Sequence, residues 1–276
     1  MKKSQLILVA VGIIAIVVLF SLPKVVVDND ATAAKVEESG EQSDAPSDVI
    51  SESHENELSS ENRTQADQLI KNFLNAPSKE EKVSAAQVLA GIYKEEGLFD
   101  SAAYYLDQAA VVLPDNLFLA EEAGKASYEA FSFALDKNKV EALAGKTRNY
   151  LGKVLEKDPN RLDLKTKIAM TYVSSANPMQ GITMIREVLE KDPQNEDGLF
   201  NMGVLSMQSG QYKKAAERFE ELIKFHPQNV QGQFYLAVSY FESNEKNKAK
   251  AQFEAVKKIT EDPMILSSIQ SYLDKL

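Results

Sequence analysis

The sequence predicts an all-α fold: a solenoid of paired helices, preceded by one transmembrane helix and a disordered linker. Two observations predict the solenoid. The turn segments Asp158-Pro159-Asn160, Asp192-Pro193-Gln194-Asn195 and His226-Pro227-Gln228-Asn229 recur every 34 residues, the length of one helix–turn–helix unit. Between these turns, apolar residues recur at helical spacing. A third observation, an uncharged N-terminal run followed by an acidic stretch, predicts the membrane helix and the linker.

Residues 1–27 are predicted to be an N-terminal membrane anchor. Lys2 and Lys3 precede the run Leu6–Leu22, which contains no charged residue. Seventeen helical residues span roughly 25 Å, slightly less than the hydrocarbon core of a bilayer. The alternative is a cleaved secretory signal, with Ala31-Thr32-Ala33 as the small-residue site. If residues 6–22 stay in the membrane, the basic N-terminus lies in the cytoplasm and the C-terminal domain in the periplasm or its equivalent.

Residues 28–62 are predicted to be a disordered acidic linker. They contain eleven acidic residues, one lysine and no aromatic residue, too little apolar surface to form a core. The whole chain has a net charge of −10, which argues against non-specific binding of nucleic acid. It has no cysteine and only His54 and His226, so no metal site or cofactor is expected. We expect His226 to be a solvated helix cap.

Residues 63–276 are predicted to form the solenoid, with repeats at about 83–116, 162–195, 196–229 and 230–263. The eighth position of each unit is small, and so is the twentieth, which lets two helices approach closely. These residues are Ala90, Ala169, Gly203 and Ala237, then Ala102, Gly181, Ala215 and Ala249. Residues 117–161 are longer and are interpreted as one degenerate repeat with lengthened helices.

Local signals predict where the helices begin and end. A helix carrying Leu69 and Phe73 should end before Pro77, and Ser78 with Glu81 has the spacing of a capping box. Three residues that tolerate the left-handed conformation should separate paired helices: Gly97, Gly210 and Asn244. Residues 264–276 have one apolar face and are predicted to be a capping helix, because stacked repeats need polar ends.

The repeated pattern resembles the tetratricopeptide repeat, most clearly at Asn201-Met202-Gly203, Gly210-Gln211-Tyr212, Ala215, Phe219 and Pro227. The resemblance implies a right-handed superhelical solenoid. The chain departs from the family pattern because it has no Trp, has Ser206 in place of an aromatic residue, and places Pro263 two residues late.

The resemblance also implies a concave groove, lined by the first helix of each repeat, that binds a protein or peptide. Carried over position by position, the peptide-binding residues are Asp197, Phe200, Asn201, Val204, Met207, Gln208, Gln231, Phe234, Val238 and Phe241. Asn201 stands where the family often bonds a peptide backbone. The competing interpretation is that these residues pack inside the solenoid.

No catalytic constellation accompanies the repeats, so we expect no enzyme activity. Gly145-Lys146-Thr147 resembles the end of a phosphate-binding loop, but the required glycine is replaced by Val140. The leading hypothesis is a membrane-anchored interaction scaffold or chaperone-like adaptor, and the resemblance implies roles in secretion, envelope assembly or cytochrome maturation. The alternative is a structural module that self-assembles into homo-oligomers.

Overall fold

A computed structural model describes residues 58–276, which form twelve α-helices and no strand. The helices are α2 (Ser60–Leu74), α3 (Lys79–Glu95), α4 (Phe99–Val112), α5 (Leu117–Phe133), α6 (Lys137–Lys157), α7 (Leu162–Val173), α8 (Pro178–Lys191), α9 (Glu196–Gln208), α10 (Tyr212–Phe225), α11 (Val230–Glu242), α12 (Lys246–Lys257) and α13 (Pro263–Leu273). The predicted all-α class is therefore confirmed for this part of the chain.

The anchor predicted for residues 1–27 and the linker up to residue 57 lie outside the described residues. From residue 58 onward, no helix combines the length and the apolar character needed to cross a membrane. Residues 60–62, assigned to the linker from their composition, instead form the first turn of α2. The side chains of Ser59 and Asn62 both donate hydrogen bonds to Glu96, at 3.0 and 2.5 Å, and fix this turn against the end of α3.

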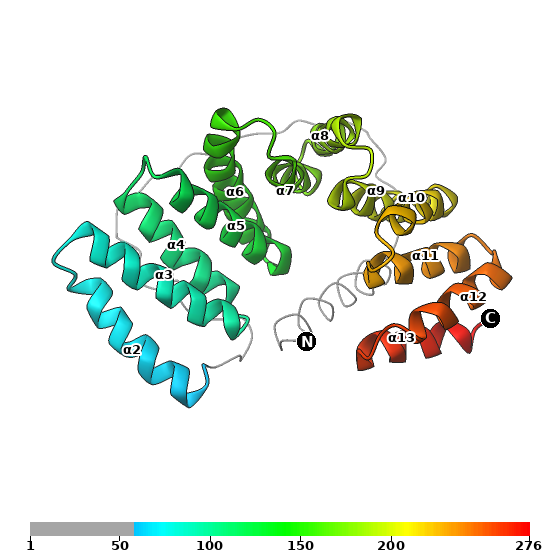
Figure 1. Ribbon diagram of the computed structural model, residues 1–276, viewed down its shortest axis with the longest axis horizontal. Helices are drawn as coiled ribbons and strands as arrows, with labels where there is room; N and C mark the ends of the chain where they lie inside the picture. Colours follow the sequence, from blue (N-terminus) through cyan, green and yellow to red (C-terminus); the bar gives the residue numbers. More distant parts are fainter. Residues whose placement is uncertain (1–57) are drawn as a thin grey trace, which may run out of the picture.

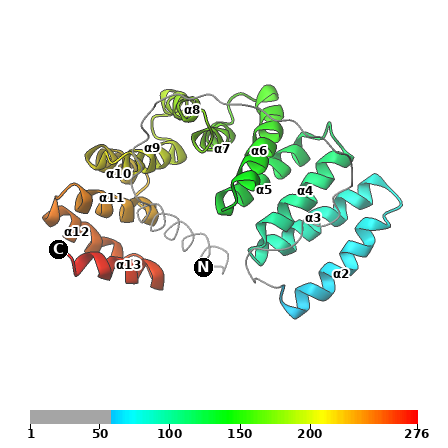
Figure 2. The ribbon, with the colours of Figure 1, turned by 180° about the vertical axis from the view of Figure 1, so that it is seen from behind.

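The helices stack in chain order into a curved solenoid (Figure 1). Along the arc, α7, α9 and α11 lie on the inner side, and α8, α10 and α12 lie on the outer side. The view from behind shows the same arrangement (Figure 2). The first and last helices, α2 and α13, lie at the two ends of the arc, on its open side.

The predicted start and turn signals are confirmed. The Ser78 hydroxyl accepts a hydrogen bond from the Glu81 amide at 3.2 Å and donates one to the Glu81 carboxylate at 3.3 Å. Gly97, Gly210 and Asn244 have φ angles of 78°, 71° and 64°. Each left-handed residue lets the chain reverse between two antiparallel helices.

The small residues allow close contact between paired helices, as expected. A Cβ atom on Gly203 would lie 2.6 Å from the ring of Phe219, and one on Gly181 would lie 2.3 Å from the carbonyl oxygen of Ala169. Ala169 and Ala215 are fully buried. The repeat positions predicted from spacing are therefore the places where helix backbones meet.

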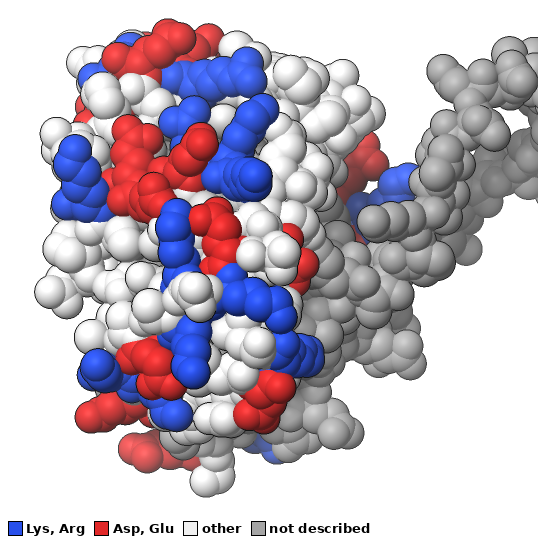
Figure 3. Space-filling view, turned by 90° about the vertical axis from the view of Figure 1, so that its right-hand side faces the viewer, with Lys and Arg blue, Asp and Glu red and all other residues white. Residues whose placement is uncertain are grey.

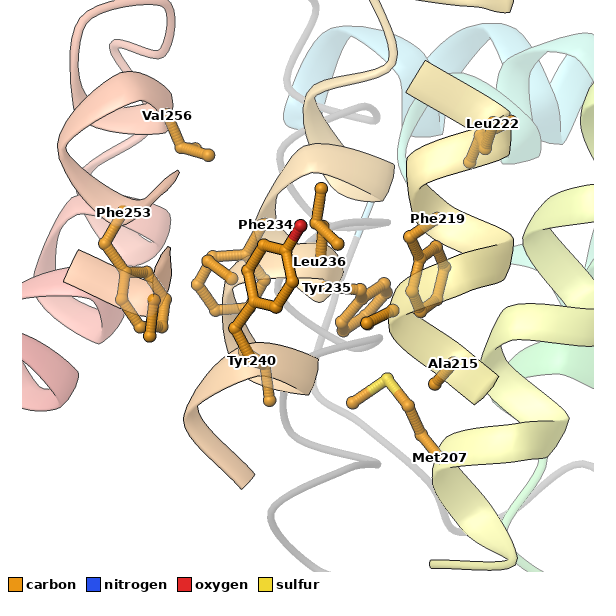
Figure 4. Close-up of a cluster of buried hydrophobic side chains, with 14 of the residues drawn as sticks. Met207, Ala215, Phe219, Leu222, Phe234, Tyr235, Leu236, Tyr240, Phe253 and Val256 are labelled. Carbon is orange, nitrogen blue, oxygen red and sulfur yellow. The ribbon is translucent and has the colours of Figure 1, made fainter. Parts of the chain in front are cut away.

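The apolar interior divides into two main clusters. The N-terminal cluster is centred on residues such as Leu89, Leu119 and Leu151, and the C-terminal cluster on residues such as Phe219 and Phe253. Part of the C-terminal cluster is drawn in Figure 4. The division lies at α8, where Met184 packs on the N-terminal cluster and Leu189 on the C-terminal one.

Candidate functional site

Three of the predicted peptide-binding residues belong to the interior. Phe234, Val238 and Met207 are only 6%, 3% and 4% exposed. The ring of Phe234 lies 6.1 Å from that of Phe253 (Figure 4). It also lies 6.3 Å from the ring of Tyr272. The capping helix α13 supplies Tyr272 and covers this part of α11. For these three side chains, internal packing replaces the expected contact with a ligand.

The other seven predicted residues keep solvent-accessible surface on α9 and α11. Asp197 and Gln208 are exposed, and the remainder are partly buried. We call this set the inner patch, because α9 and α11 lie on the inner side of the arc. The inner patch consists of Asp197, Phe200, Asn201, Val204, Gln208, Gln231 and Phe241.

The aromatic residues of the inner patch rest on the core. The ring of Phe200 contacts those of Phe219 and Tyr235, with centroids 6.0 and 5.7 Å apart. Phe241 meets Tyr272 edge to face at 5.1 Å. Because each ring is supported from below, little side-chain entropy remains to be lost when a ligand covers the exposed side.

Asn201 is held by its own helix. Its side-chain amide donates a hydrogen bond to the carbonyl oxygen of Asp197 at 2.8 Å. The amide oxygen remains as an acceptor on the surface of α9. The geometry therefore favours recognition of a donor group, such as a peptide N–H, at this position.

Two further residues extend the inner patch towards α5 and α7. The ammonium group of Lys167 lies 5.3 Å from the centre of the Tyr128 ring, a cation–π distance. Burial raises the pKa of Tyr128 to about 12, and the negative charge of Asp197 contributes. Tyr128, Lys167 and Asp197 thus bring side chains of α5, α7 and α9 close to one another.

Sequence reasoning missed Tyr128 and Lys167 as site residues because only the last two repeats were used to assign the groove. Tyr128 is position 12 of the unit that begins at residue 117, and Lys167 is position 6 of the next unit. The same register, continued upstream, would have found both residues.

A network of ion pairs also joins α5 to the start of α7, and its positive and negative side chains neutralise one another. Arg161 donates two hydrogen bonds to Glu121, at 2.8 and 2.7 Å, and also pairs with Asp163. The hydrogen bonds from Arg161 lower the pKa of Glu121 to about 2, and Lys125 contributes to the shift. By contrast, neither Lys167 nor Asp197 forms an ion pair within residues 58–276. Their charges are available to a ligand.

The site offers recognition rather than a reactive group. Over the described part of the chain, no group of three His, Asp or Glu side chains is arranged to hold a metal ion. His226 ends α10 as a cap, with its amide donating to Leu222 at 2.7 Å. Its ring is not simply solvated as expected, because Nε2 lies 2.6 Å from the carbonyl oxygen of Gln194 in the preceding turn.

Comparison with known proteins supports the repeat assignment. The family model of the tetratricopeptide repeat matches residues 206–267. Among curated proteins, none matches this chain.

Two solved structures show the same fold. A tetratricopeptide repeat protein from Parabacteroides merdae is 17% identical, with a TM-score of 0.57 over 76% of this chain and 77% of that chain. A thermophilic tetratricopeptide repeat protein of Thermus thermophilus is 13% identical, with a TM-score of 0.53 over 69% of this chain and 98% of that chain. Residues 58–276 are therefore a solenoid of the tetratricopeptide type.

Proposed function

We propose that this protein is a membrane-anchored interaction scaffold or adaptor that binds an apolar segment of another polypeptide on its inner patch. The observation that carries the proposal is the pair Phe200 and Phe241, whose rings are fixed by the core yet remain partly exposed on neighbouring inner helices. Exposed apolar surface on a rigid support is typical of protein-binding sites. The supporting fold is one that serves protein interaction in many systems.

The charges around the inner patch specify the ligand further. Asp197 lies at the start of α9 and Glu242 at the end of α11, both exposed and without an ion-pair partner in the described structure. An amphipathic helix or an extended apolar peptide would fit, provided that basic side chains flank its apolar residues. The ammonium group of Lys167 would repel a positive charge of the peptide only where the peptide passes Tyr128.

Membrane attachment is the second part of the proposal, and it rests on the sequence. The uncharged run of residues 6–22 after Lys2 and Lys3 supports a retained helix with a cytoplasmic N-terminus. Residues 63–276 would then act outside the cytoplasm, next to the membrane. Such a placement suits an adaptor for secretion, envelope assembly or cytochrome maturation.

The two end helices favour partner binding over self-assembly by stacking. The outer face of α2 exposes Glu61, Gln65, Gln68 and Asn72, which recur at helical spacing. On α13, Ser267 and Ser271 are exposed, and so is the C-cap residue Asp274. A solenoid grows by stacking only through an apolar terminal face, so these polar ends oppose it.

Photo-crosslinking in native membranes tests the proposal. A photoreactive residue is placed at Asp197 in one variant and at Gln208 in another, because these exposed side chains lie at opposite ends of α9. The matched control carries it at Lys213, exposed on the outer helix α10. We expect one polypeptide to be captured from both inner positions and not from Lys213.

A second comparison measures how much adduct forms when an aromatic side chain of the inner patch is removed. Adding Phe200→Ala or Phe241→Ala should lower the yield of that adduct roughly tenfold, the effect of losing an aromatic contact in an interface. Thermal unfolding of each variant shows that the solenoid is still folded. Capture of different proteins from Asp197 and Gln208, capture of the same protein from Lys213, or an unchanged yield in both alanine variants would contradict binding at the inner patch.

A further inference from the structure

A basic face lies on α12, away from the inner patch. Residues 246–258 contain five lysines and one glutamate, a net charge of +4, whereas residues 63–276 as a whole carry −3. This end of the molecule shows many Lys and Arg side chains, interspersed with acidic ones (Figure 3). The segment from Lys246 to Lys258 is therefore strongly basic within an acidic solenoid.

The lysines of this face line a depression between α12 and α13. Its volume is about 450 Å³. Lys246, Lys250 and Lys257 lie along one side of α12, and α13 forms the other wall. The depression is lined by Lys246, Asn247, Lys250, Glu254, Lys257, Gln270, Leu273, Asp274 and Leu276.

Glu254 and Asp274 also line the depression, but neither forms an ion pair with any of these three lysines. Lys257 donates a weak hydrogen bond to the side-chain oxygen of Gln270 at 3.4 Å, and Lys246 lies 3.5 Å from a carboxylate oxygen of the last residue, Leu276. The neighbouring Lys248 differs, since it pairs with Glu245 at 2.7 Å. The three ammonium groups therefore keep spare donors, and the net charge of +4 on residues 246–258 favours a ligand with several carboxylates.

We infer that the acidic segment 28–57 of the same chain docks in the depression between α12 and α13. That segment contains ten acidic residues and one lysine, a net charge of −9, so its charge is complementary to the lysine face. Carboxylates spaced along an extended segment would engage Lys246, Lys250 and Lys257 together. The attraction is electrostatic and depends on salt.

The length of the segment permits this contact. Thirty residues, if disordered as the sequence predicts, would have an end-to-end distance of about 30 Å and reach at most about 100 Å. The segment enters the solenoid at α2, and α2 and α13 lie at the two ends of the arc on its open side (Figure 1). Covalent connection gives the segment an effective concentration in the millimolar range, above that of most free acidic partners.

Carbodiimide cross-linking tests the inference, because it joins carboxylates to amines only when they are in direct contact. The full chain is reconstituted in nanodiscs of neutral lipid, cross-linked, and mapped by mass spectrometry. We expect cross-links between residues 28–57 and Lys246, Lys250 or Lys257, with a yield roughly tenfold lower in 0.5 M NaCl. Lys137, Lys157 and Lys191, exposed on α6 and α8, serve as reference lysines.

A pair of triple variants supplies the matched control. Replacing Lys246, Lys250 and Lys257 by Gln should abolish cross-links from residues 28–57 to α12, including those to Lys248, while helix content by circular dichroism is unchanged. Replacing Lys137, Lys157 and Lys191 by Gln should leave the cross-links to α12 intact. Equal labelling of α12 and the reference lysines, or cross-links to Lys248 that persist in the first variant, would overturn the inference.

Two further outcomes identify other occupants of the lysine face. If a mixture of isotopically light and heavy chains gives mainly mixed cross-links, the acidic segment reaches a neighbouring copy and the intramolecular contact is wrong. If anionic lipid in the nanodisc abolishes the cross-links, the lysine face binds the membrane surface in preference to the acidic segment. Both outcomes overturn the inference and leave the proposed binding of a polypeptide at the inner patch unaffected.

Discussion

Arg161 and Glu121 form a two-point ion pair that joins the start of α7 to α5. The two guanidinium nitrogens lie 2.8 and 2.7 Å from the two carboxylate oxygens. Arg161 also pairs with Asp163, so one cation links two acidic side chains from different repeats. The pair fixes the start of α7 against α5, the two helices that carry Lys167 and Tyr128.

This ion pair should make stability depend on pH. The pKa of Glu121 is lowered to about 2 from an ordinary value of 4.5, chiefly by the hydrogen bonds from Arg161. A lowered pKa in the folded state stabilises the protein above about pH 4.5, and this stabilisation is lost as the pH falls towards 2. Arg161→Ala should cost about 1 kcal/mol at pH 7, since the pair is partly solvated.

Urea unfolding between pH 7 and pH 2.5 measures this effect. The difference in unfolding free energy between the parent and Arg161→Ala should shrink as the pH falls from 4.5. Arg186→Ala, which removes an exposed arginine of α8, is the control and should change stability little at any pH. A difference that stayed constant across this range would show that the pair does not control the protonation of Glu121.

Replacing glycine by alanine should lower stability at one position and raise it at another. At Gly181, a Cβ atom would lie 2.3 Å from the carbonyl oxygen of Ala169 and 2.7 Å from the amide nitrogen of Val173. Backbone atoms cannot move aside easily, so Gly181→Ala should cost about 1–3 kcal/mol. Gly152 lies inside α6 with nothing within 4 Å of its Cβ position, so Gly152→Ala should gain about 0.5–1 kcal/mol. Thermal unfolding measures both, and loss of stability in both variants would refute the close α7–α8 contact as the cause.

The turn after α11 should require a residue that tolerates the left-handed conformation. Asn244 has φ of 64°, and the next amide, that of Glu245, donates to Tyr240 at 2.8 Å to close the helix. Asn244→Ala should cost about 1 kcal/mol, whereas Asn244→Gly should cost little, since glycine adopts this conformation without strain. Denaturant titration of the two variants checks this, and equal stabilities would show that the turn conformation is not limiting.

The two apolar clusters should unfold separately. Phe253 is fully buried in the C-terminal cluster, and Phe253→Ala should destabilise that cluster by about 3–5 kcal/mol. Because each repeat contacts only its neighbours, hydrogen exchange should accelerate in α10 to α13 and stay unchanged in α3 to α6. Acceleration of equal size in both halves would mean that the solenoid unfolds as one unit.

Much of the fold could be predicted because the repeat encodes it locally. The spacing of Gly203, Ala215 and Phe219 identifies which helix faces meet, and Gly210 marks the reversal between them. These features depend on neighbours within one 34-residue unit, which a single sequence contains.

The site was harder to predict because it depends on what lies beyond each repeat. Phe234 occupies a groove position, but Tyr272 of the capping helix packs on it, and repeat spacing carries no information about that contact. Tyr128 was missed because only the last two repeats were used to assign the groove. His226 contacts Gln194 across two turns, a relationship that neither turn reveals alone.

A calorimetric titration tests most directly whether the inner patch binds a polypeptide segment. The segment identified by crosslinking from Asp197 is titrated into the full chain, into Phe200→Ala, and into Lys213→Ala as the outer-surface control. We expect Phe200→Ala to weaken binding by roughly tenfold or more, and Lys213→Ala to leave the affinity unchanged. Equal affinities for all three proteins would contradict binding at the inner patch.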